Sequence, residues 1–324
     1  MSTRTHRAAP GFHVLTWNVF HLRDGRTPPT ADLASTVLFR PRHADGYVHL
    51  NRKHLDQMGA LLRSADADAV LLQEVPPTAI PALARHARMH AAVAVRTGPW
   101  LGSTALRGRL GAANPDLWRT HEGNANVILL GPRVRPIPGS ATVIHLNPRP
   151  AALQAALRQR LSPAEVLRWM GEPRRAIAVT VSLDAGDPVT LVCSHLHGAR
   201  TEWQAMFEIR RLAEWVTRQP HPVVLGGDLN AAPGHPGLRL LAEAGLDTSC
   251  GETIGIDRIL VRGLRGEPEN RWPTRARTIR VWLGGRSAWL RLSDHDPVSR
   301  RLETPGHDPA VTGRAGEAAP PSRP

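Results

Sequence analysis

The sequence predicts an α/β protein in which a mixed β-sheet is covered by helices. Short apolar runs of strand length alternate with amphipathic segments of helical period along most of the chain. Some strand-like runs alternate apolar with polar residues, whereas others are continuously apolar. A strand with one solvated face alternates and a strand covered on both faces does not, so the mixture indicates strands with different degrees of cover.

Helices are predicted at residues 52–64 and 200–218, and the second carries one apolar stripe at helical spacing. Residues 151–170 are predicted to form two helices, because Ser162 is a good N-cap and Pro163 a good first helical residue. Strands are predicted at residues 12–17, 69–72, 91–95, 126–130, 141–146, 176–183, 189–195, 223–226 and 256–261.

Residues 281–292 predict a β-hairpin that turns at Gly284–Gly285. Its two tryptophans, Trp282 and Trp289, are expected to pack against the body of the protein rather than to enter a membrane. Residues 98–121 carry few signals, and no element is predicted there.

The length of 324 residues fits one large domain, since no linker-like segment or internal repeat interrupts the pattern. We expect a domain over residues 11–302, preceded by a flexible N-terminus over residues 1–10. A disordered tail is expected over residues 303–324, which are rich in Pro, Gly and Ala and have no periodic apolar pattern.

No apolar run approaches the ~20 residues of a membrane span, and residues 1–10 lead into no apolar segment of a secretory signal. The expected protein is therefore cytoplasmic, without a transmembrane segment, and is taken to be a monomer. Cys193 and Cys250 are predicted to be free thiols in a reducing compartment, because neither has the spacing of a metal site.

The formal net charge of +13 favours an anionic partner such as nucleic acid, anionic lipid or a phosphorylated metabolite. Of the 41 basic residues Lys53 is the only lysine, and the sequence contains no basic block typical of a nucleic-acid-binding arm. Such a preference for arginine also arises from the nucleotide composition of a gene. The charge therefore supports an acidic substrate only weakly.

Polar residues stand at the ends of several predicted strands, where sites at the rim of a sheet are commonly built. Asn18 ends the first strand, although an Asn there is also a common turn residue. Glu74 closes a buried strand, where an ionised carboxylate needs a partner or a metal. Because Pro76 and Pro77 follow, Glu74 is also compatible with the start of a helix.

Further polar clusters follow three later strands. His195 and His197 have the His-X-His spacing of a metal site, although a strand histidine is more often packed in a core. Asp228 and Asn230 follow two glycines and offer oxygen ligands that suit Mg²⁺ or Mn²⁺, with an Asx-rich turn as the alternative.

The last cluster is Asp294-His295-Asp296, which supplies a carboxylate and a proton acceptor from adjacent positions. Upstream, Asp257 lies in an apolar strand, where its burial is costly unless it is paired. A histidine is the natural partner, because a buried carboxylate fixes the tautomer of the ring and raises its basicity.

In order and spacing, this set resembles the endonuclease/exonuclease/phosphatase superfamily, the fold of deoxyribonuclease I and exonuclease III. The similarity extends over about residues 11–302. The motifs that carry it are TWN (16–18), LLQEV (71–75), GNA (123–125), SHLHG (194–198), GGDLNAAP (226–233), IDRI (256–259) and SDHDPV (293–298). The resemblance implies a four-layer α/β sandwich with two mixed central β-sheets flanked by helices.

The resemblance also implies a role for each site residue. Glu74 would be the principal ligand of Mg²⁺ or Mn²⁺, with Asn18 and Asp294 nearby. Asp228 would orient or activate the attacking water, and Asn230 would hold the substrate phosphate.

Two histidines would complete this implied site. His295, oriented by Asp257, would act as general base or phosphate ligand, and His195 would donate to a phosphate oxygen or the leaving group. Ser194 and Asp296 depart from the residues common in the family, but neither change removes a reacting group.

The implied activity is metal-dependent hydrolysis of a phosphodiester, with DNA or RNA as an expected substrate class. Alternatives that use the same site are sphingomyelinase-like hydrolysis of a lipid and phosphatase action on a small molecule such as an inositol phosphate. An alternative of another class is a non-catalytic binding module on this fold. Every site position carries a chemically competent residue, which favours an enzyme.

Overall fold

The computed structural model describes residues 11–25, 42–44, 46–97, 123–171, 173–183, 188–198, 202–249 and 255–303. The expectations for residues 1–10, for residues 98–121, for Cys250 and for the tail after residue 303 concern residues outside these ranges. Among the described residues, no helix has the length and apolar character needed to cross a membrane.

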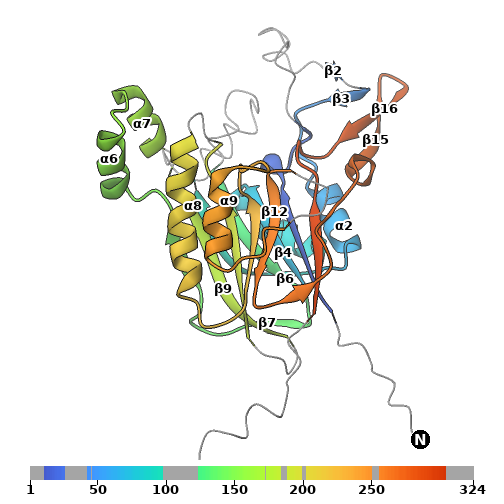
Figure 1. Ribbon diagram of the computed structural model, residues 1–324. Helices are drawn as coiled ribbons and strands as arrows, with labels where there is room; N and C mark the ends of the chain where they lie inside the picture. Colours follow the sequence, from blue (N-terminus) through green and yellow to red (C-terminus); the bar gives the residue numbers. More distant parts are fainter. Residues whose placement is uncertain are drawn as a thin grey trace, which may run out of the picture.

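Two mixed β-sheets form the centre of the molecule (Figure 1). The first has seven strands in the order β13-β17-β1-β4-β6-β5, with β14 also paired to β17. It is mixed because β1 runs parallel to β4 and antiparallel to β17. Its strands are β1 (Phe12–Asn18), β4 (Ala69–Val75), β5 (His90–Thr97), β6 (Asn124–Leu130), β13 (Arg265–Gly266), β14 (Asn270–Arg271) and β17 (Val298–Glu303).

The second sheet has six strands in the order β12-β11-β10-β9-β7, with β8 paired to β9. Only the β10–β11 pair is parallel within this described sheet. Its strands are β7 (Val134–Pro136), β8 (Thr142–His145), β9 (Arg175–Leu183), β10 (Val189–His195), β11 (Val223–Asp228) and β12 (Asp257–Arg262).

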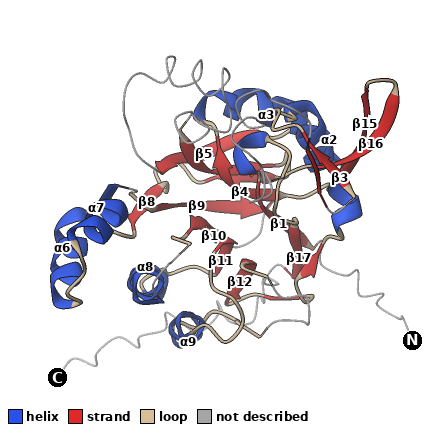
Figure 2. Cartoon of the chain, turned by 90° about the horizontal axis from the view of Figure 1, so that it is seen from above, coloured by secondary structure: helices blue, strands red, loops and turns tan. Residues whose placement is uncertain are grey.

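Helices cover the outer face of each sheet, which completes the predicted four layers (Figure 2). Helices α2 (Leu55–Ser64) and α3 (Ile80–Ala87) cover the first sheet, and α8 (Glu202–Thr217) and α9 (Pro236–Glu243) cover the second. Strand β1 carries apolar residues on both of its faces because both faces are buried. Phe12 and Val14 pack between the sheets, whereas Leu15 and Trp17 pack on the helix side.

Helices α6 (Arg149–Arg158) and α7 (Pro163–Gly171) stand beside this sandwich, as Figure 2 shows. The predicted division of this segment is confirmed. The Ser162 Oγ and the Glu165 backbone N–H are 3.4 Å apart, and Glu165 accepts a hydrogen bond from the Ser162 backbone N–H, which together form a capping box. The Trp169 ring joins the pair to α8 by edge-to-face contacts with Trp203 and Phe207.

Cys193 is a free buried thiol, as predicted, and burial raises its pKa to about 12. The β15–β16 hairpin is also confirmed, with strands Thr278–Leu283 and Arg286–Arg291 on either side of the two glycines. A shorter hairpin, β2 (Arg42–Ala44) with β3 (Tyr47–His49), lies beside it.

The packing role expected for the hairpin tryptophans is wrong. Trp282 is 72% exposed and Trp289 is 49% exposed. The register pairs Trp289 with Arg280 and Trp282 with Ser287, which puts both tryptophans on the outward face. The other face packs on the core through residues such as Val281 and Leu290. Alternation along the strands therefore leaves the aromatic rings in solvent.

Helix α2 begins three residues later than predicted because residues 50–54 wrap around the Asp24 carboxylate. Asp24 is fully buried and accepts hydrogen bonds from the backbone N–H groups of Leu50 (2.6 Å), Asn51 (2.9 Å) and Arg52 (2.7 Å). His54 Nε2 lies 3.2 Å from the same group. Burial raises the pKa of Asp24, but these hydrogen bonds outweigh burial and hold it below the usual value.

We expect Asp24→Ala to lower the free energy of unfolding by roughly 3 kcal/mol at pH 7, because three amide donors lose their acceptor. Since the folded-state pKa of Asp24 is depressed, its contribution is complete above about pH 4 and is lost as pH falls through the folded-state pKa. Urea unfolding at pH 7 and pH 3 measures both effects. The control is Asp56→Ala, whose side chain is 75% exposed and whose loss should cost less than about 0.5 kcal/mol. Equal losses for both variants would contradict this account.

Candidate active site

The strand registers bring the predicted site residues to one end of the two sheets. In the second sheet His195 pairs with Asp228, and Asp228 pairs with Asp257, so one row across β10, β11 and β12 carries three site residues. In the first sheet Asn18 pairs with Gln73, directly before Glu74. The parallel strands within each sheet end at the same edge, which is why these polar ends converge.

Two glycines in β11 allow this convergence. The strand continues through them to Asp228, two residues beyond the predicted end. A Cβ on Gly226 would lie 2.4 Å from Leu71 Cδ1 of the other sheet, and a Cβ on Gly227 would lie 1.8 Å from the Ser194 carbonyl oxygen. The glycines therefore serve the close approach of neighbouring strands and sheets rather than a turn.

Asp257 and His295 form a hydrogen-bonded pair, as the sequence indicates. His295 Nδ1 donates to Asp257 Oδ2 over 2.7 Å, and His295 Nε2 lies 3.8 Å from Asp228 Oδ2. The loop that carries His295 is fastened to β1, because Trp17 Nε1 donates to the His295 carbonyl (2.9 Å) and Ser293 Oγ donates to the Asn18 carbonyl (2.6 Å). The imidazole is thus held between two carboxylates.

Asn18 links the carboxylates of the two sheets. Its Nδ2 donates to Glu74 Oε1 (3.2 Å) and to Asp228 Oδ2 (3.1 Å). Its Oδ1 accepts from the Phe20 backbone N–H over 3.1 Å, which fixes the orientation of the amide. In this arrangement Asn18 positions Glu74 and Asp228, and its role as a metal ligand stays a prediction.

His195 is buried beside the same carboxylates, with Nε2 at 3.5 Å from Asp228 Oδ2 and 3.9 Å from Glu74 Oε1. Burial, together with the nearby charge of Arg174, holds its pKa well below the usual value. The ring is therefore neutral at physiological pH. His197 lies beyond the end of β10, and its backbone N–H donates to Glu208 of α8 over 2.8 Å. His195 and His197 therefore do not alternate along one strand as the His-X-His spacing suggested.

The pKa values of the other two titrating groups, Asp228 and His295, are both raised, in contrast to that of His195. Burial and the neighbouring Asp257 raise the pKa of Asp228 to about 7. Burial lowers the pKa of His295, but the hydrogen bond and charge of Asp257 and the charge of Asp228 outweigh it and raise the pKa to about 10. At neutral pH the site therefore holds an imidazolium next to a carboxylate that can accept a proton.

Asn230 and Asp294 lie at the edge of this group. Asn230 Nδ2 donates to the Leu196 carbonyl (2.9 Å), and its backbone N–H donates to Asp228 Oδ1 (3.0 Å). Asp294 Oδ1 lies 3.9 Å from His295 Nε2, and its side chain is partly exposed. The phosphate-binding role of Asn230 and the metal-binding role of Asp294 stay predictions.

Asp296 has a structural role beside the site. Its carboxylate accepts from Arg271 Nη2 (2.8 Å) and Arg277 Nε (2.5 Å). Arg277 also donates to the carbonyls of Leu292 (3.0 Å) and Ser293 (2.6 Å). These bonds tie the loop before His295 to the base of the β15–β16 hairpin.

His21 is a site residue that the sequence did not predict. It lies in a single 3-10 turn, Phe20–Leu22, directly after β1, and its Nε2 is 3.3 Å from Glu74 Oε2. It is 4% exposed. The sequence signal was a histidine three residues after Asn18, but the apolar neighbours of His21 concealed it.

The donor chemistry of the site fits a hard divalent cation. The carboxylates of Asp228, Asp257 and Asp294 lie around the His295 imidazolium, and Asn18 links Glu74 to Asp228, which leaves a surplus of negative charge that a cation would neutralise. One ligand atom each of Asp228, Asp257 and His295 also lies within 4.8 Å of the others. The 2.7 Å hydrogen bond between Asp257 and His295 accounts for part of that proximity. Glu74 as the principal metal ligand stays a prediction.

The comparisons with known proteins agree with this geometry. The chain matches the Endonuclease/Exonuclease/phosphatase family over residues 15–295. A comparison with curated protein sequences found no match.

Three similar solved structures share the fold. An endonuclease/exonuclease/phosphatase family protein from Bacteroides thetaiotaomicron is 13% identical with a TM-score of 0.59, covering 91% of this chain and 98% of that chain. The mannosyl-6-phosphatase from the same species is 13% identical with a TM-score of 0.57, covering 90% and 99%. The human Nocturnin catalytic domain with a bound sulfate anion is 16% identical with a TM-score of 0.53, covering 91% and 94%. At these identities the likeness concerns the fold alone.

The protein is thus an α/β sandwich of two mixed sheets, with a paired histidine and converging carboxylates at one edge. This chain belongs to the Endonuclease/Exonuclease/phosphatase family.

We expect Asp257→Asn to lower the pKa of His295 from about 10 towards its ordinary value of about 6.5, because the variant removes the strongest stabilisation of the imidazolium. NMR titration of the ring in the metal-free protein measures this pKa. Exposed Glu243→Gln on α9 is the control and should leave it unchanged. An unchanged pKa in Asp257→Asn would show that Asp257 does not control the charge of His295.

Proposed function

We propose that this protein is a divalent-metal-dependent phosphoesterase that hydrolyses phosphodiester bonds of nucleic acid. The observation that carries the proposal is the contact of His295 with Asp257 on one side and Asp228 on the other, which holds an imidazolium beside a carboxylate with a pKa of about 7. A phosphodiester is anionic, so its hydrolysis needs positive donors on the phosphate and a base for the attacking water.

The residues of the chain divide this work. Asp228 accepts the proton of the water whose oxygen bonds to phosphorus, and His295 donates hydrogen bonds to a non-bridging phosphate oxygen. Neutral His195 donates a hydrogen bond to the leaving oxygen as the P–O ester bond breaks. The proton that Asp228 takes from the water is then released and protonates the leaving oxygen through solvent, which yields an alcohol and a phosphate monoester. A divalent cation on Glu74, with Asp294 nearby, supplies charge neutralisation for the phosphate when it is bound. Asn230 would help to hold the phosphate.

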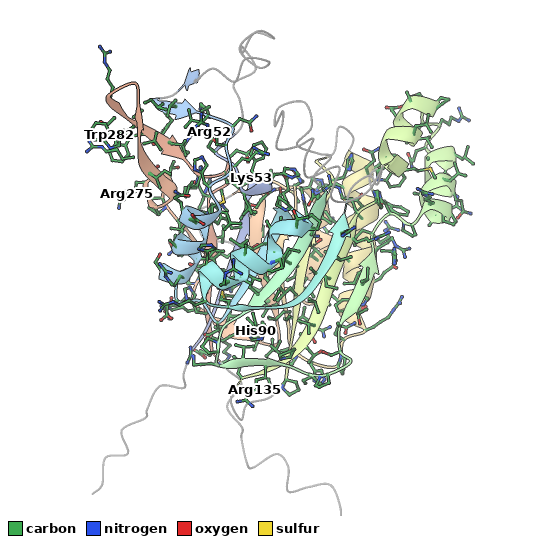
Figure 3. All side chains as sticks on the ribbon, turned by 180° about the vertical axis from the view of Figure 1, so that it is seen from behind. Arg52, Lys53, His90, Arg135, Arg275 and Trp282 are labelled. Atoms are coloured by element: carbon green, nitrogen blue, oxygen red, sulfur yellow. The ribbon has the colours of Figure 1, made fainter. Side chains whose placement is uncertain are left out.

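The surface beside the site supports a nucleic-acid substrate. Trp282 and Trp289 are exposed diagonal neighbours on the outer face of the hairpin, and the Arg280 guanidinium lies 5.1 Å from the centroid of the Trp289 ring. Figure 3 shows Trp282 and Arg275 on this side of the molecule, with Arg52 and Lys53 nearer its middle. Exposed aromatic rings among arginines suit stacked bases and their phosphates.

Each of two alternative substrates is favoured by one observation. The fold neighbour named mannosyl-6-phosphatase favours a small phosphorylated sugar, and the exposed tryptophans favour a lipid surface in a sphingomyelinase-like enzyme. At the tip of the hairpin, however, stand Gly284, Gly285 and the exposed Arg286 rather than an aromatic wedge, which favours a polyanion.

Chelation tests the metal dependence directly. Hydrolysis of bis-p-nitrophenyl phosphate should stop in EDTA and return with Mg²⁺ or Mn²⁺. Glu74→Gln should move the activity to higher metal concentration. His295→Ala should lower kcat by roughly 10²-fold or more and leave the metal affinity measured by calorimetry nearly unchanged. Exposed Glu243→Gln is the matched control for Glu74→Gln.

Activity that survives exhaustive chelation would overturn the metal mechanism. Metal binding that is unchanged in Glu74→Gln would overturn its assignment as principal ligand. If no phosphate ester, sphingomyelin, inositol phosphate or nucleic acid is hydrolysed with either metal, the non-catalytic binding module becomes the better description.

Binding of DNA and RNA by the inactive Asp228→Asn variant in Ca²⁺ should weaken steeply with salt, because each neutralised phosphate releases counterions. Replacing Trp282 and Trp289 by Ala should weaken binding of single strands by roughly 1–3 kcal/mol for each lost stack. In the active background the same replacements should leave hydrolysis of bis-p-nitrophenyl phosphate unchanged.

The control for the tryptophans is Leu157→Ala, an exposed apolar residue on α6 away from the hairpin. A flat salt response, or an absence of binding at low salt, would reject nucleic acid and favour the small-molecule or lipid substrate. Binding of sphingomyelin vesicles that is lost with the two tryptophans would identify the lipid alternative.

A further inference from the structure

The feature that the proposed mechanism leaves unused is His21, a buried histidine at the predicted metal ligand. We propose that His21 is a nitrogen ligand of the divalent cation at Glu74, and that it biases the site towards Mn²⁺ over Mg²⁺. The inference rests on the proposed metal site, but it concerns which residues hold the cation rather than what is hydrolysed.

The backbone around His21 adopts a conformation that requires a reason. Phe20, His21 and Leu22 have φ values of 44°, 54° and 60°, three successive non-glycine residues in the left-handed region. Each such residue costs roughly 1–2 kcal/mol. The turn is held by hydrogen bonds from the Phe20 N–H to Asn18 Oδ1 (3.1 Å) and from the Leu22 N–H to the Val19 carbonyl (2.8 Å).

This strained turn directs the imidazole back to the end of β4. Glu74 itself has a φ of 55°, so both residues of the pair lie on unusual backbone. Strain of this kind persists where the surrounding structure fixes it, and it is concentrated at functional sites. In this protein it brings His21 Nε2 and Glu74 Oε2 together.

The distance between them suits two ligands of one cation. His21 Nε2 and Glu74 Oε2 are 3.3 Å apart, beyond the usual 2.7–3.2 Å of an N–H···O hydrogen bond. Two neighbouring ligands that each bond a cation at about 2.1 Å lie roughly 3.0–3.4 Å apart. The other oxygen, Oε1, is 3.2 Å from Asn18 Nδ2, so Oε2 is the one that faces the imidazole.

Each site histidine has a different carboxylate neighbour. His295 is bonded to Asp257, and His195 lies closest to Asp228, whereas His21 has Glu74. His21 is therefore the imidazole placed nearest to the predicted principal ligand. Because imidazole nitrogen suits Mn²⁺ and other transition metals better than Mg²⁺, this ligand would shift the preference of an otherwise all-oxygen site.

The test is direct metal binding by the chelator-stripped full-length protein, without substrate. We expect the spin-echo spectrum of bound Mn²⁺ to show ¹⁴N coupling from an imidazole in the wild type, and to lose it in His21→Asn. Calorimetry should show Mn²⁺ affinity falling by roughly ten-fold or more in His21→Asn, with a smaller change for Mg²⁺.

Two comparison variants make this test specific. His195→Asn should retain the ¹⁴N coupling, which excludes His195 as its source, so that its loss in His21→Asn assigns the nitrogen to His21. His90→Asn replaces an exposed histidine at the far end of the molecule from the site and should change nothing (Figure 3). Should His21→Asn fail to fold, the wild-type and His195→Asn spectra decide: coupling that is absent from the wild type, or that is lost in His195→Asn, would overturn the proposal.

Absence of ¹⁴N coupling in wild-type Mn²⁺ protein, or an unchanged Mn²⁺ to Mg²⁺ preference in folded His21→Asn, would overturn the proposal. Either result would leave His21 as a residue that only orients Glu74. Hydrolysis of bis-p-nitrophenyl phosphate separates this failure from failure of the proposed function. If the enzyme is active but shows no coupling, only the proposal for His21 is refuted. If the protein shows the coupling but is inactive, only the proposed function is refuted.

Discussion

The site depends on one hydrogen bond that crosses between the two sheets. Asn18, at the end of β1, donates to Asp228, at the end of β11, over 3.1 Å. The sheets come close enough for this bond because Gly226 has no side chain to meet Leu71 of the opposite sheet. A larger residue at Gly226 would separate the carboxylates of Glu74 and Asp228, so the fold and the chemistry share the same constraint.

The different neighbours of each ionisable group give the site its electrostatic character. Asp228 and His295 are both buried, but Asp228 has another carboxylate for a neighbour and His295 has a hydrogen-bonded one. The carboxylate beside Asp228 raises the pKa of that acid, and the carboxylate bonded to His295 raises the pKa of that base. His195 is neutral, so the three buried groups Asp228, His295 and His195 differ in charge at one pH.

The sequence predicts the strands and most of the site because buried strands ending in polar residues leave a clear pattern. Asn18, Glu74, His195 and Asp228 could be found since each closes an apolar run, and the Asp257–His295 pair since a carboxylate in an apolar strand needs a partner. Features set by distant contacts left no such pattern.

Three differences from the prediction show what the pattern misses. The start of α2 depends on Asp24, some thirty residues upstream. The outward face of the hairpin depends on which side of it meets the core, which alternation alone does not specify. The position of His21 depends on a left-handed turn built from residues with no preference for that conformation.

The hairpin and the loop that carries His295 are joined by hydrogen bonds. Arg277, at the base of β15, donates to the Leu292 and Ser293 carbonyls and to Asp296, on both sides of His295. Ser293 in turn bonds the Asn18 carbonyl at the end of β1. A partner that binds the exposed tryptophans therefore rests on the same short segment that places the imidazolium. Because these hydrogen bonds connect the two, the hairpin surface has a fixed position relative to His295, and under the proposed function it would orient a long substrate there.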